Sequence, residues 1–229
     1  MNLLEHPLLD RFEGPARRRD IVSGRVPLPQ APGVYAWCFA EPPPGVSVTD
    51  CLSYDGYPML YVGISPDSRS KPGSRQGLRN RIRHHLCGNA EGSTLRRTLG
   101  ILLSEQSGFP LRRVGSGKRM TLTHLGEQWL DHWLDENALL FWQAVDQPWI
   151  LEEEIIENVS CPLNLRGNEE HRFNRSLRNM RSAAIAQSPN MRSDTLAAIW
   201  TFISSCRSSR EIRSSVFFTC SSGPSSHCR

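Results

Sequence analysis

Apolar residues cluster at three places along the chain in the manner of β-strands. Residues 33–39 and 59–64 are rich in aromatic and β-branched side chains, and residues 138–145 have the same character. Between the first two segments, residues 40–58 contain several prolines and glycines, which predict a surface excursion rather than a tight turn. The pattern therefore predicts a small, mainly antiparallel sheet of three strands.

A helical period marks the segments between and after these strands. Residues 78–86 carry one apolar stripe, and Ser93 is placed to act as the N-cap of the following helix. Residues 148–159 begin with a proline, which is well tolerated in the first turn of a helix. Residues 169–186 show the same period as the last helix.

The segment 123–137 is also predicted to be helical, and it is rich in tryptophan and leucine. A helix in this register would bury one apolar face against the sheet. We expect this face to consist of Leu125, Trp129, Leu130, Trp133 and Leu134.

These elements predict an α/β protein in which a small three-stranded sheet is flanked by helices. We expect a lead-in arm over residues 1–29 and one domain over residues 30–186. From residue 187 to 229 the chain is serine-rich and shows no period, which predicts a disordered tail. The roles of the tail and of the excursion at 40–58 stay open.

Composition narrows the class of protein. The 229 residues are 38% hydrophobic and 22% charged, which is typical of a soluble globular protein. The seven cysteines show no CxxC spacing, and the first ten residues lack the features of a signal peptide. We therefore expect a cytoplasmic protein with reduced thiols. No apolar run approaches the roughly 18 residues of a membrane span, so no membrane contact is expected.

Positive charge is concentrated locally rather than spread over the chain. The net charge is +4, but the segment from Gln187 onward holds five arginines against two acids, so overall basicity says little. Eight basic residues lie between Arg69 and Arg97. A basic stripe of this density is typical of nucleic-acid binding, although a solvated surface would look the same. The stripe consists of Arg69, Lys71, Arg75, Arg79, Arg81, Arg83, Arg96 and Arg97.

One acid in the helix at 148–159 is in an unusual position. At about 100° per residue, Leu151 and Ile155 lie on a buried stripe, and Glu152 points into that stripe. A carboxylate facing a core is costly unless a cation or metal accompanies it, so Glu152 is a candidate ligand. The alternative is a small roll of the helix that exposes it. The other acids are expected to face water: Glu153, Glu154 and Glu157.

A second candidate pair lies on the helix at 78–86. Arg81 and His85 are four residues apart, so they stack on one flank of the apolar stripe. Such a pair at the edge of a core can face a cleft jointly. A solvated basic helix with a packed histidine is the alternative interpretation.

The order of these residues resembles the GIY-YIG nuclease family, which includes homing endonucleases, some restriction enzymes and the incision domain of bacterial excision-repair nucleases. The resemblance covers roughly residues 30–186. Six residues carry it, and they occur in the family's order. They are Tyr35 in "GVY", Tyr61 in "YVG", Arg81 in "LRNR", His85 four residues later, Glu152 in "LEEEII" and Asn164 in "PLN".

The resemblance implies a role for each of these residues. Glu152 would be the sole protein ligand of one Mg²⁺ or Mn²⁺ ion, and Arg81 would neutralise the scissile phosphate. Tyr35, helped by Tyr61 or His85, would orient or deprotonate the attacking water, and the choice of base among them stays open. The remaining residue, Asn164, would anchor its loop or a phosphate.

We therefore expect a divalent-metal-dependent endonuclease that hydrolyses phosphodiester bonds, in DNA in the first instance. An RNA nuclease and a catalytically inactive nucleic-acid-binding module of the same fold are the alternatives. Cleavage specificity, pathway, protein partners and oligomeric state stay open. The backbone-contacting residues are expected to be Arg79, Arg83, Arg96, Arg97, Arg112, Arg113, Lys118 and Arg119.

Overall fold

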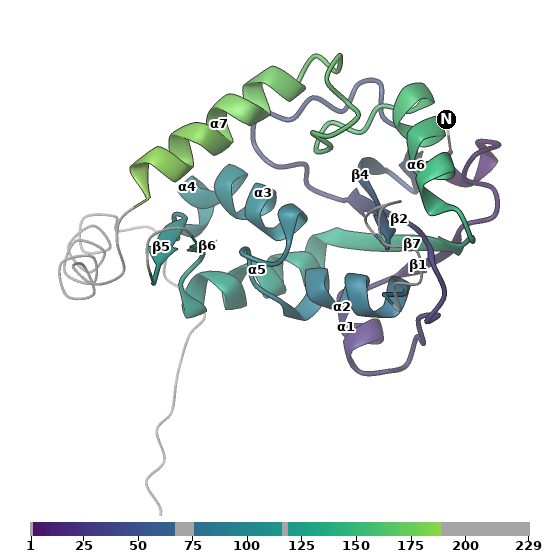
Figure 1. Ribbon diagram of the computed structural model, residues 1–229, viewed down its shortest axis with the longest axis horizontal. Helices are drawn as coiled ribbons and strands as arrows, with labels where there is room; N and C mark the ends of the chain where they lie inside the picture. The colour runs from purple at the N-terminus through teal and green to yellow at the C-terminus, as the bar shows by residue number, and fades with distance from the viewer. Residues whose placement is uncertain (1, 67–75, 116–118, 189–229) are drawn as a thin grey trace, which may run out of the picture. The chain divides into compact units, whose positions relative to one another are not determined.

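A computed structural model of the chain describes residues 2–66, 76–115 and 119–188 (Figure 1). Its centre is a five-stranded antiparallel sheet in the order β1-β7-β2-β4-β3. The described residues belong to one compact unit, residues 1–191. The strands are β1 (Glu13–Ala16), β2 (Gly33–Phe39), β3 (Ser53–Tyr54), β4 (Tyr57–Ser65) and β7 (Ala138–Ala144).

The predicted count of three strands is wrong, although β2, β4 and β7 confirm the three predicted positions. The two additional strands are short and lie at the sheet edges. Strand β1 comes from the first 29 residues, where "EGPA" contains a glycine and a proline that weaken any strand signal. Strand β3 has two residues and joins β4 through a turn at Asp55 and Gly56, both of which have positive φ.

Every residue of the central strand β2 is buried, because side chains cover both faces of the sheet. Tyr35, Trp37 and Phe39 belong to one core cluster, whereas the alternating residues between them belong to another. Helix α2 packs on the first face and helix α6 on the second. Figure 1 shows these two helices on opposite sides of the sheet.

The predicted helices form near the expected positions. Ser93 caps α3, since its side chain accepts a hydrogen bond from the Arg96 backbone N–H. The helices with at least eight residues are α2 (Leu78–Cys87), α3 (Thr94–Leu102), α5 (His124–Asn137), α6 (Pro148–Asn158) and α7 (Asn174–Gln187). Shorter pieces are η1 (Leu3–Glu5), α1 (Arg18–Val22) and α4 (Ser104–Ser107).

The buried face of α5 differs from the predicted one at its first turn. Leu125 is 62% exposed, and Gly126 is buried instead. A Cβ atom at Gly126 would lie 2.9 Å from Phe109 Cβ, so the helix approaches its neighbour closely at this position. The buried face therefore starts one residue later than the apolar pattern indicates, and it continues through Leu130 and Trp133 as predicted.

Helix α7 begins at Asn174 rather than at residue 169, because two buried asparagines hold the preceding segment in turns. Asn168 donates to the carbonyl oxygens of Cys161 and Asn164. Asn174 donates to the carbonyl oxygens of Leu165 and Asn168. These side chains bind the carbonyls of a compact loop, which competes with helix formation.

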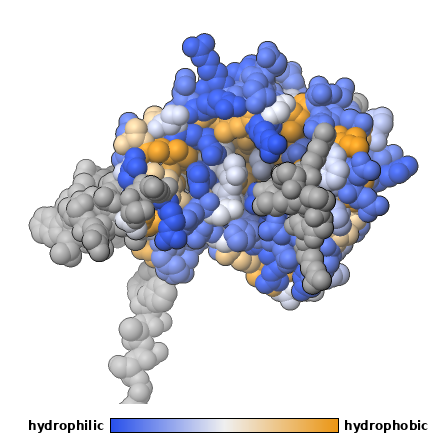
Figure 2. Space-filling view, viewed as in Figure 1, coloured by the Kyte–Doolittle hydropathy of each residue, from blue (hydrophilic) through white to orange (hydrophobic). Residues whose placement is uncertain are grey.

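The basic segment after α4 forms a two-stranded hairpin of β5 (Arg112–Val114) and β6 (Arg119–Thr121), which the sequence did not predict. On the face shown in Figure 2, hydrophilic residues dominate and apolar residues form scattered patches. Within the described part of the chain, no helix is long and apolar enough to span a bilayer.

Candidate active site

The candidate site begins where β2 and β4 pair beneath α2. Tyr35 lies opposite Gly63 in the antiparallel register. A Cβ atom on Gly63 would come within 2.6 Å of the Tyr35 hydroxyl oxygen and 2.7 Å of the ring carbon that carries it. Gly63, the glycine of "YVG", therefore provides the space in which the Tyr35 side chain lies.

Helix α2 brings two side chains to the Tyr35 hydroxyl. The hydroxyl oxygen lies 2.7 Å from His85 Nε2, and Arg81 Nε donates to it at 3.4 Å. The four-residue spacing thus places Arg81 and His85 on one flank of the helix, as predicted. His85 and Tyr35 are buried, whereas Arg81 is partly buried.

Tyr61 completes a group of three rings. Its ring centroid lies 6.5 Å from that of Tyr35 and 6.4 Å from that of His85, and the side chain is 8% exposed. Burial raises the pKa of Tyr61 to about 12, and it raises the pKa of Tyr35 well above its ordinary value. Both tyrosines are therefore neutral phenols at physiological pH.

Burial also lowers the pKa of His85 well below its ordinary value. The neighbouring side chains of Arg81, His84 and Arg96 add to this lowering of the His85 pKa. The imidazole is consequently neutral at pH 7, and one of its two nitrogens carries the hydrogen while the other accepts.

Glu152 lies on α6, which packs on the other face of the sheet. It is partly buried, whereas Glu153 and Glu154 are exposed, in agreement with the helical period. Its negative charge is a lesser contribution, after burial, to the raised pKa values of Tyr35 and Tyr61. The carboxylate therefore lies within electrostatic reach of both phenols.

Asn164 closes the open edge of β4. Its side-chain oxygen accepts from the Val62 N–H at 2.9 Å, and its side-chain nitrogen donates to the Val62 carbonyl at 2.8 Å. One residue earlier, the Leu163 N–H donates to the Leu60 carbonyl at 2.9 Å. Asn164 was predicted to anchor either its loop or a phosphate. These bonds match the loop anchor, because both the oxygen and the nitrogen of its side-chain amide bond to backbone groups.

Arg96 does not belong to the predicted nucleic-acid surface, and this expectation needs correction. Its side chain is 0% exposed and forms ion pairs with Glu127 at 2.7 Å and Asp131 at 2.6 Å. It also donates to the carbonyl oxygen of His85. Arg96 lies at a helix position that faces the core, where acids of α5 neutralise it, so it is not available to a phosphate.

The other predicted contacts differ in accessibility. Arg79 and Arg83 are exposed on α2, and Arg119 is exposed with Glu91 at 3.5 Å. Three further arginines, Arg97, Arg112 and Arg113, are partly buried, and two of them, Arg97 and Arg113, donate to backbone carbonyls. Lys118 lies outside the described residues, as do Arg69, Lys71 and Arg75 of the basic stripe.

Two neighbours of the cluster were not predicted as site residues. Ser93 Oγ lies 2.7 Å from His85 Nδ1, a contact between two helices that the sequence does not reveal. Arg181 of α7 donates to Thr98 Oγ1, and its positive charge partly offsets the rise in the pKa of Tyr61 that burial causes. A signal existed for Arg181, because it follows Leu177 by four residues and so places a charge on the buried side of its helix.

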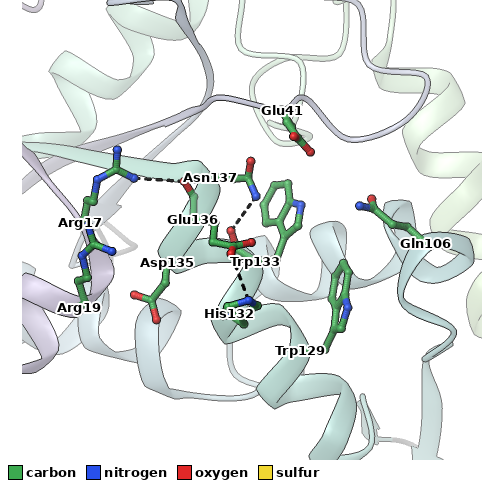
Figure 3. A pocket seen from close by; sticks show the side chains of 10 residues that line it. All are labelled: Arg17, Arg19, Glu41, Gln106, Trp129, His132, Trp133, Asp135, Glu136 and Asn137. Carbon is green, nitrogen blue, oxygen red and sulfur yellow. Dashed lines mark hydrogen bonds and ion pairs between the residues drawn. The ribbon is translucent and has the colours of Figure 1, made fainter. Parts of the chain in front are cut away.

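A hollow of about 600 Å³ lies elsewhere, between α1, α4 and α5 (Figure 3). Its walls mix aromatic, acidic and basic groups, and Arg17 donates to the Glu136 carbonyl within it. None of the six predicted active-site residues lines this hollow. The tyrosine cluster, not this hollow, is therefore the candidate active site.

No group of three or more histidine, cysteine, aspartate or glutamate side chains that could hold a metal occurs among residues 2–66, 76–115 and 119–188. A metal site built by several protein ligands is thus not found in that part of the chain. A single carboxylate remains compatible with Mg²⁺, which keeps several of its waters when it binds to proteins.

Comparison with known families agrees with the geometry. A family model described as the GIY-YIG catalytic domain matches residues 33–183, which is more than half of the chain. The matched segment contains all six residues of the candidate site. Searches of curated proteins and of solved structures gave no significant match. The family match supports a nuclease-type enzyme with a nucleic-acid substrate.

Proposed function

Because the chain belongs to the GIY-YIG catalytic-domain family, we propose that it is an endonuclease that hydrolyses phosphodiester bonds in DNA with the aid of one Mg²⁺ or Mn²⁺ ion. One observation carries the proposal. Arg81 and His85 of α2 meet at the Tyr35 hydroxyl, within electrostatic reach of the Glu152 carboxylate from the opposite side of the sheet.

Arg81 would bind the scissile phosphate. Its Nε is oriented by the Tyr35 hydroxyl, and a guanidinium has further N–H groups that match phosphate oxygens. The transition state of phosphodiester hydrolysis gains negative charge on the phosphate. A positive group fixed in place before the reaction stabilises that charge without reorganisation, which lowers the barrier.

Glu152 would hold the metal ion. The donor set fits, since one partly buried carboxylate beside neutral phenols leaves most coordination positions to water and phosphate oxygens. When bound, the ion would supply Lewis acidity at the phosphate and lower the pKa of a coordinated water.

The tyrosines would orient the attacking water. Both are neutral phenols at physiological pH, and the hydrogen bond between them would let Tyr35 position the Tyr61 hydroxyl, which would contact the water. Asn164 would hold β4 and its Tyr61 in place through the Val62 backbone.

DNA backbone contacts are proposed for the exposed arginines Arg79, Arg83 and Arg119.

The experiment is cleavage of supercoiled plasmid by the purified protein in Mg²⁺, in Mn²⁺ and in EDTA. We expect nicked or linear product with either metal and none in EDTA. Glu152→Gln should abolish cleavage while leaving DNA affinity within a few fold. Glu154→Gln, which changes an exposed acid on the same helix, should cut like the wild type.

The outcomes separate the alternatives. Cleavage of labelled RNA without cleavage of DNA of the same sequence would assign an RNA nuclease. If wild type and Glu152→Gln bind DNA equally and neither cuts with any divalent metal, the chain is a binding module. Cleavage that persists in EDTA would refute the metal role.

A further inference from the structure

A continuous series of buried hydrogen bonds leads from the start of α3 to the tyrosine pair. The Arg96 backbone N–H donates to Ser93 Oγ at 3.0 Å, and Ser93 Oγ lies 2.7 Å from His85 Nδ1. His85 Nε2 in turn lies 2.7 Å from the Tyr35 hydroxyl. Ser93 and His85 are both fully buried, so each hydrogen in the series needs a partner within the protein.

The hydroxyl of Ser93 can satisfy its bonding in one way only among the contacts described. Its oxygen already accepts from the Arg96 N–H. Within the described residues, His85 Nδ1 is the one acceptor that it contacts. If His85 Nδ1 carried a hydrogen and donated to Ser93, the serine hydrogen would be buried without an acceptor, which costs about 1–3 kcal/mol.

The direction of the Ser93 bond determines the direction of the next one. When Nδ1 accepts, the neutral imidazole carries its hydrogen on Nε2, and Nε2 then donates to Tyr35. Tyr35 also accepts from Arg81 Nε. Two donors therefore point at the phenol oxygen, and the phenol hydrogen must point away from both.

We propose that Ser93 is a positioning residue that fixes His85 as the Nε2–H tautomer, so that the Tyr35 hydroxyl hydrogen is directed away from His85 and toward Tyr61. A hydrogen bond with Tyr35 is one of the contributions to the pKa of Tyr61, which agrees with this direction. In this arrangement His85 is a donor to Tyr35 and not the acceptor of its proton. The importance of this orientation for cleavage rests on the proposed nuclease function.

The groups around His85 keep it neutral, so tautomer and not charge is the property that Ser93 controls. Cationic neighbours come from α2 and α3, and burial acts in the same direction. Neutral phenols face the ring from β2 and β4. These surrounding groups are Arg81, His84, Arg96, Tyr35 and Tyr61.

The test is ¹⁵N NMR of the full chain with labelled histidine at pH 7.5, without substrate. The His85 signals are assigned by their loss in His85→Gln. We expect a protonated, pyrrole-type Nε2 and an unprotonated, pyridine-type Nδ1. The reverse pattern would overturn the proposal, and because the measurement uses the wild type, it does not depend on whether any variant folds.

Variants connect the tautomer to catalysis. Ser93→Ala should shift His85 toward the Nδ1–H form and lower kcat by about 10- to 100-fold, by analogy with the loss of the partner that orients a metal-ligating histidine. KM for DNA should stay unchanged, and Ser93→Thr, which keeps the hydroxyl, should restore both readouts. An unchanged tautomer in Ser93→Ala would refute the role of Ser93.

Thr123→Ala is the matched control, because Thr123 caps α5 through the Gly126 N–H just as Ser93 caps α3. It should lose similar stability without changing the His85 signals or kcat. The two proposals fail separately. A wild type with the expected tautomer but no cleavage would refute the nuclease, whereas an active wild type with the Nδ1–H tautomer would refute only the positioning role.

Discussion

Two arginines approach His85 from different sides, and their surroundings differ sharply. Arg81 is partly buried and donates to the neutral Tyr35 hydroxyl, whereas Arg96 is fully buried between Glu127 and Asp131. Both lie in the same basic stretch of sequence. Local positive charge therefore does not identify a phosphate contact, because a buried guanidinium neutralised by partly buried carboxylates serves the fold.

We expect the strongest effect on stability from replacing Arg96, the arginine that serves the fold. Arg96→Ala should lower the free energy of unfolding by about 3 kcal/mol, because Glu127 and the His85 carbonyl lose their buried partner, while Asp131 keeps its ion pair with Arg18. Urea unfolding followed by circular dichroism measures this. Arg83→Ala removes an exposed arginine and should change stability by less than about 0.5 kcal/mol. Similar losses in both variants would remove the distinction.

Arg81→Ala should have the opposite profile. We expect kcat to fall by about 10²- to 10³-fold, as for the loss of one group that stabilises transition-state charge, with little loss of stability. Single-turnover cleavage and urea unfolding of the same preparation give both values. A variant that unfolds readily would place Arg81 beside Arg96 as a structural residue.

Gly63→Ala tests the space beneath Tyr35. The new methyl group would overlap the phenol hydroxyl, so the ring must move and its contacts with His85 and Arg81 must lengthen. We expect about a 10²-fold loss of kcat from this displacement. Gly56→Ala changes a glycine in the β3–β4 turn with open space around it, and it should retain activity despite some strain at its positive φ.

Acid should destabilise the fold through His85. Its folded-state pKa lies well below 6.5, so beneath pH 6.5 the unfolded chain binds a proton that the folded chain does not. The free energy of unfolding should therefore fall as pH decreases from 6.5, by up to about 1.4 kcal/mol per pH unit for this one group. Urea unfolding between pH 5 and 7 measures the slope.

His85→Gln should flatten that slope. His171 also has a pKa lowered by burial, so the comparison is best made in a His171→Gln background. If the slope is the same with and without His85, the imidazole is not buried in its neutral form.

The smallest effect concerns the exposed arginines of α2. Arg79→Ala and Arg83→Ala should each reduce the slope of log K against log salt for DNA binding by about 1, while cleavage at saturating DNA stays near wild type. Fluorescence anisotropy at several salt concentrations measures this. An unchanged slope would show that this face of α2 does not contact the backbone.

Much of the site was predictable because its determinants are local. The four-residue spacing of Arg81 and His85 and the helical direction of Glu152 follow from the period of an α-helix alone. Strands β2, β4 and β7 carry long apolar runs, and each was located from them.

The features that the sequence did not predict depend instead on partners that are distant along the chain. Strand β1 exists only because β7 offers an edge to pair with, and its own four residues give little signal. The acids that neutralise Arg96 lie some thirty residues away on α5, a contact that no local pattern announces. Ser93 was recognised as a helix cap, but its second partner belongs to another helix.

The amide of Asn164 has a consequence for the geometry between α6 and β4. By pairing with Val62 it takes the place of a neighbouring strand, and it ties the segment after α6 to one register of β4. The twelve-residue separation from Glu152 is thereby anchored at both ends, to a helix and to a strand. A shift of the Asn164 contact by one residue along β4 would therefore move the end of this segment relative to Tyr61, and with it the placement of α6 and Glu152.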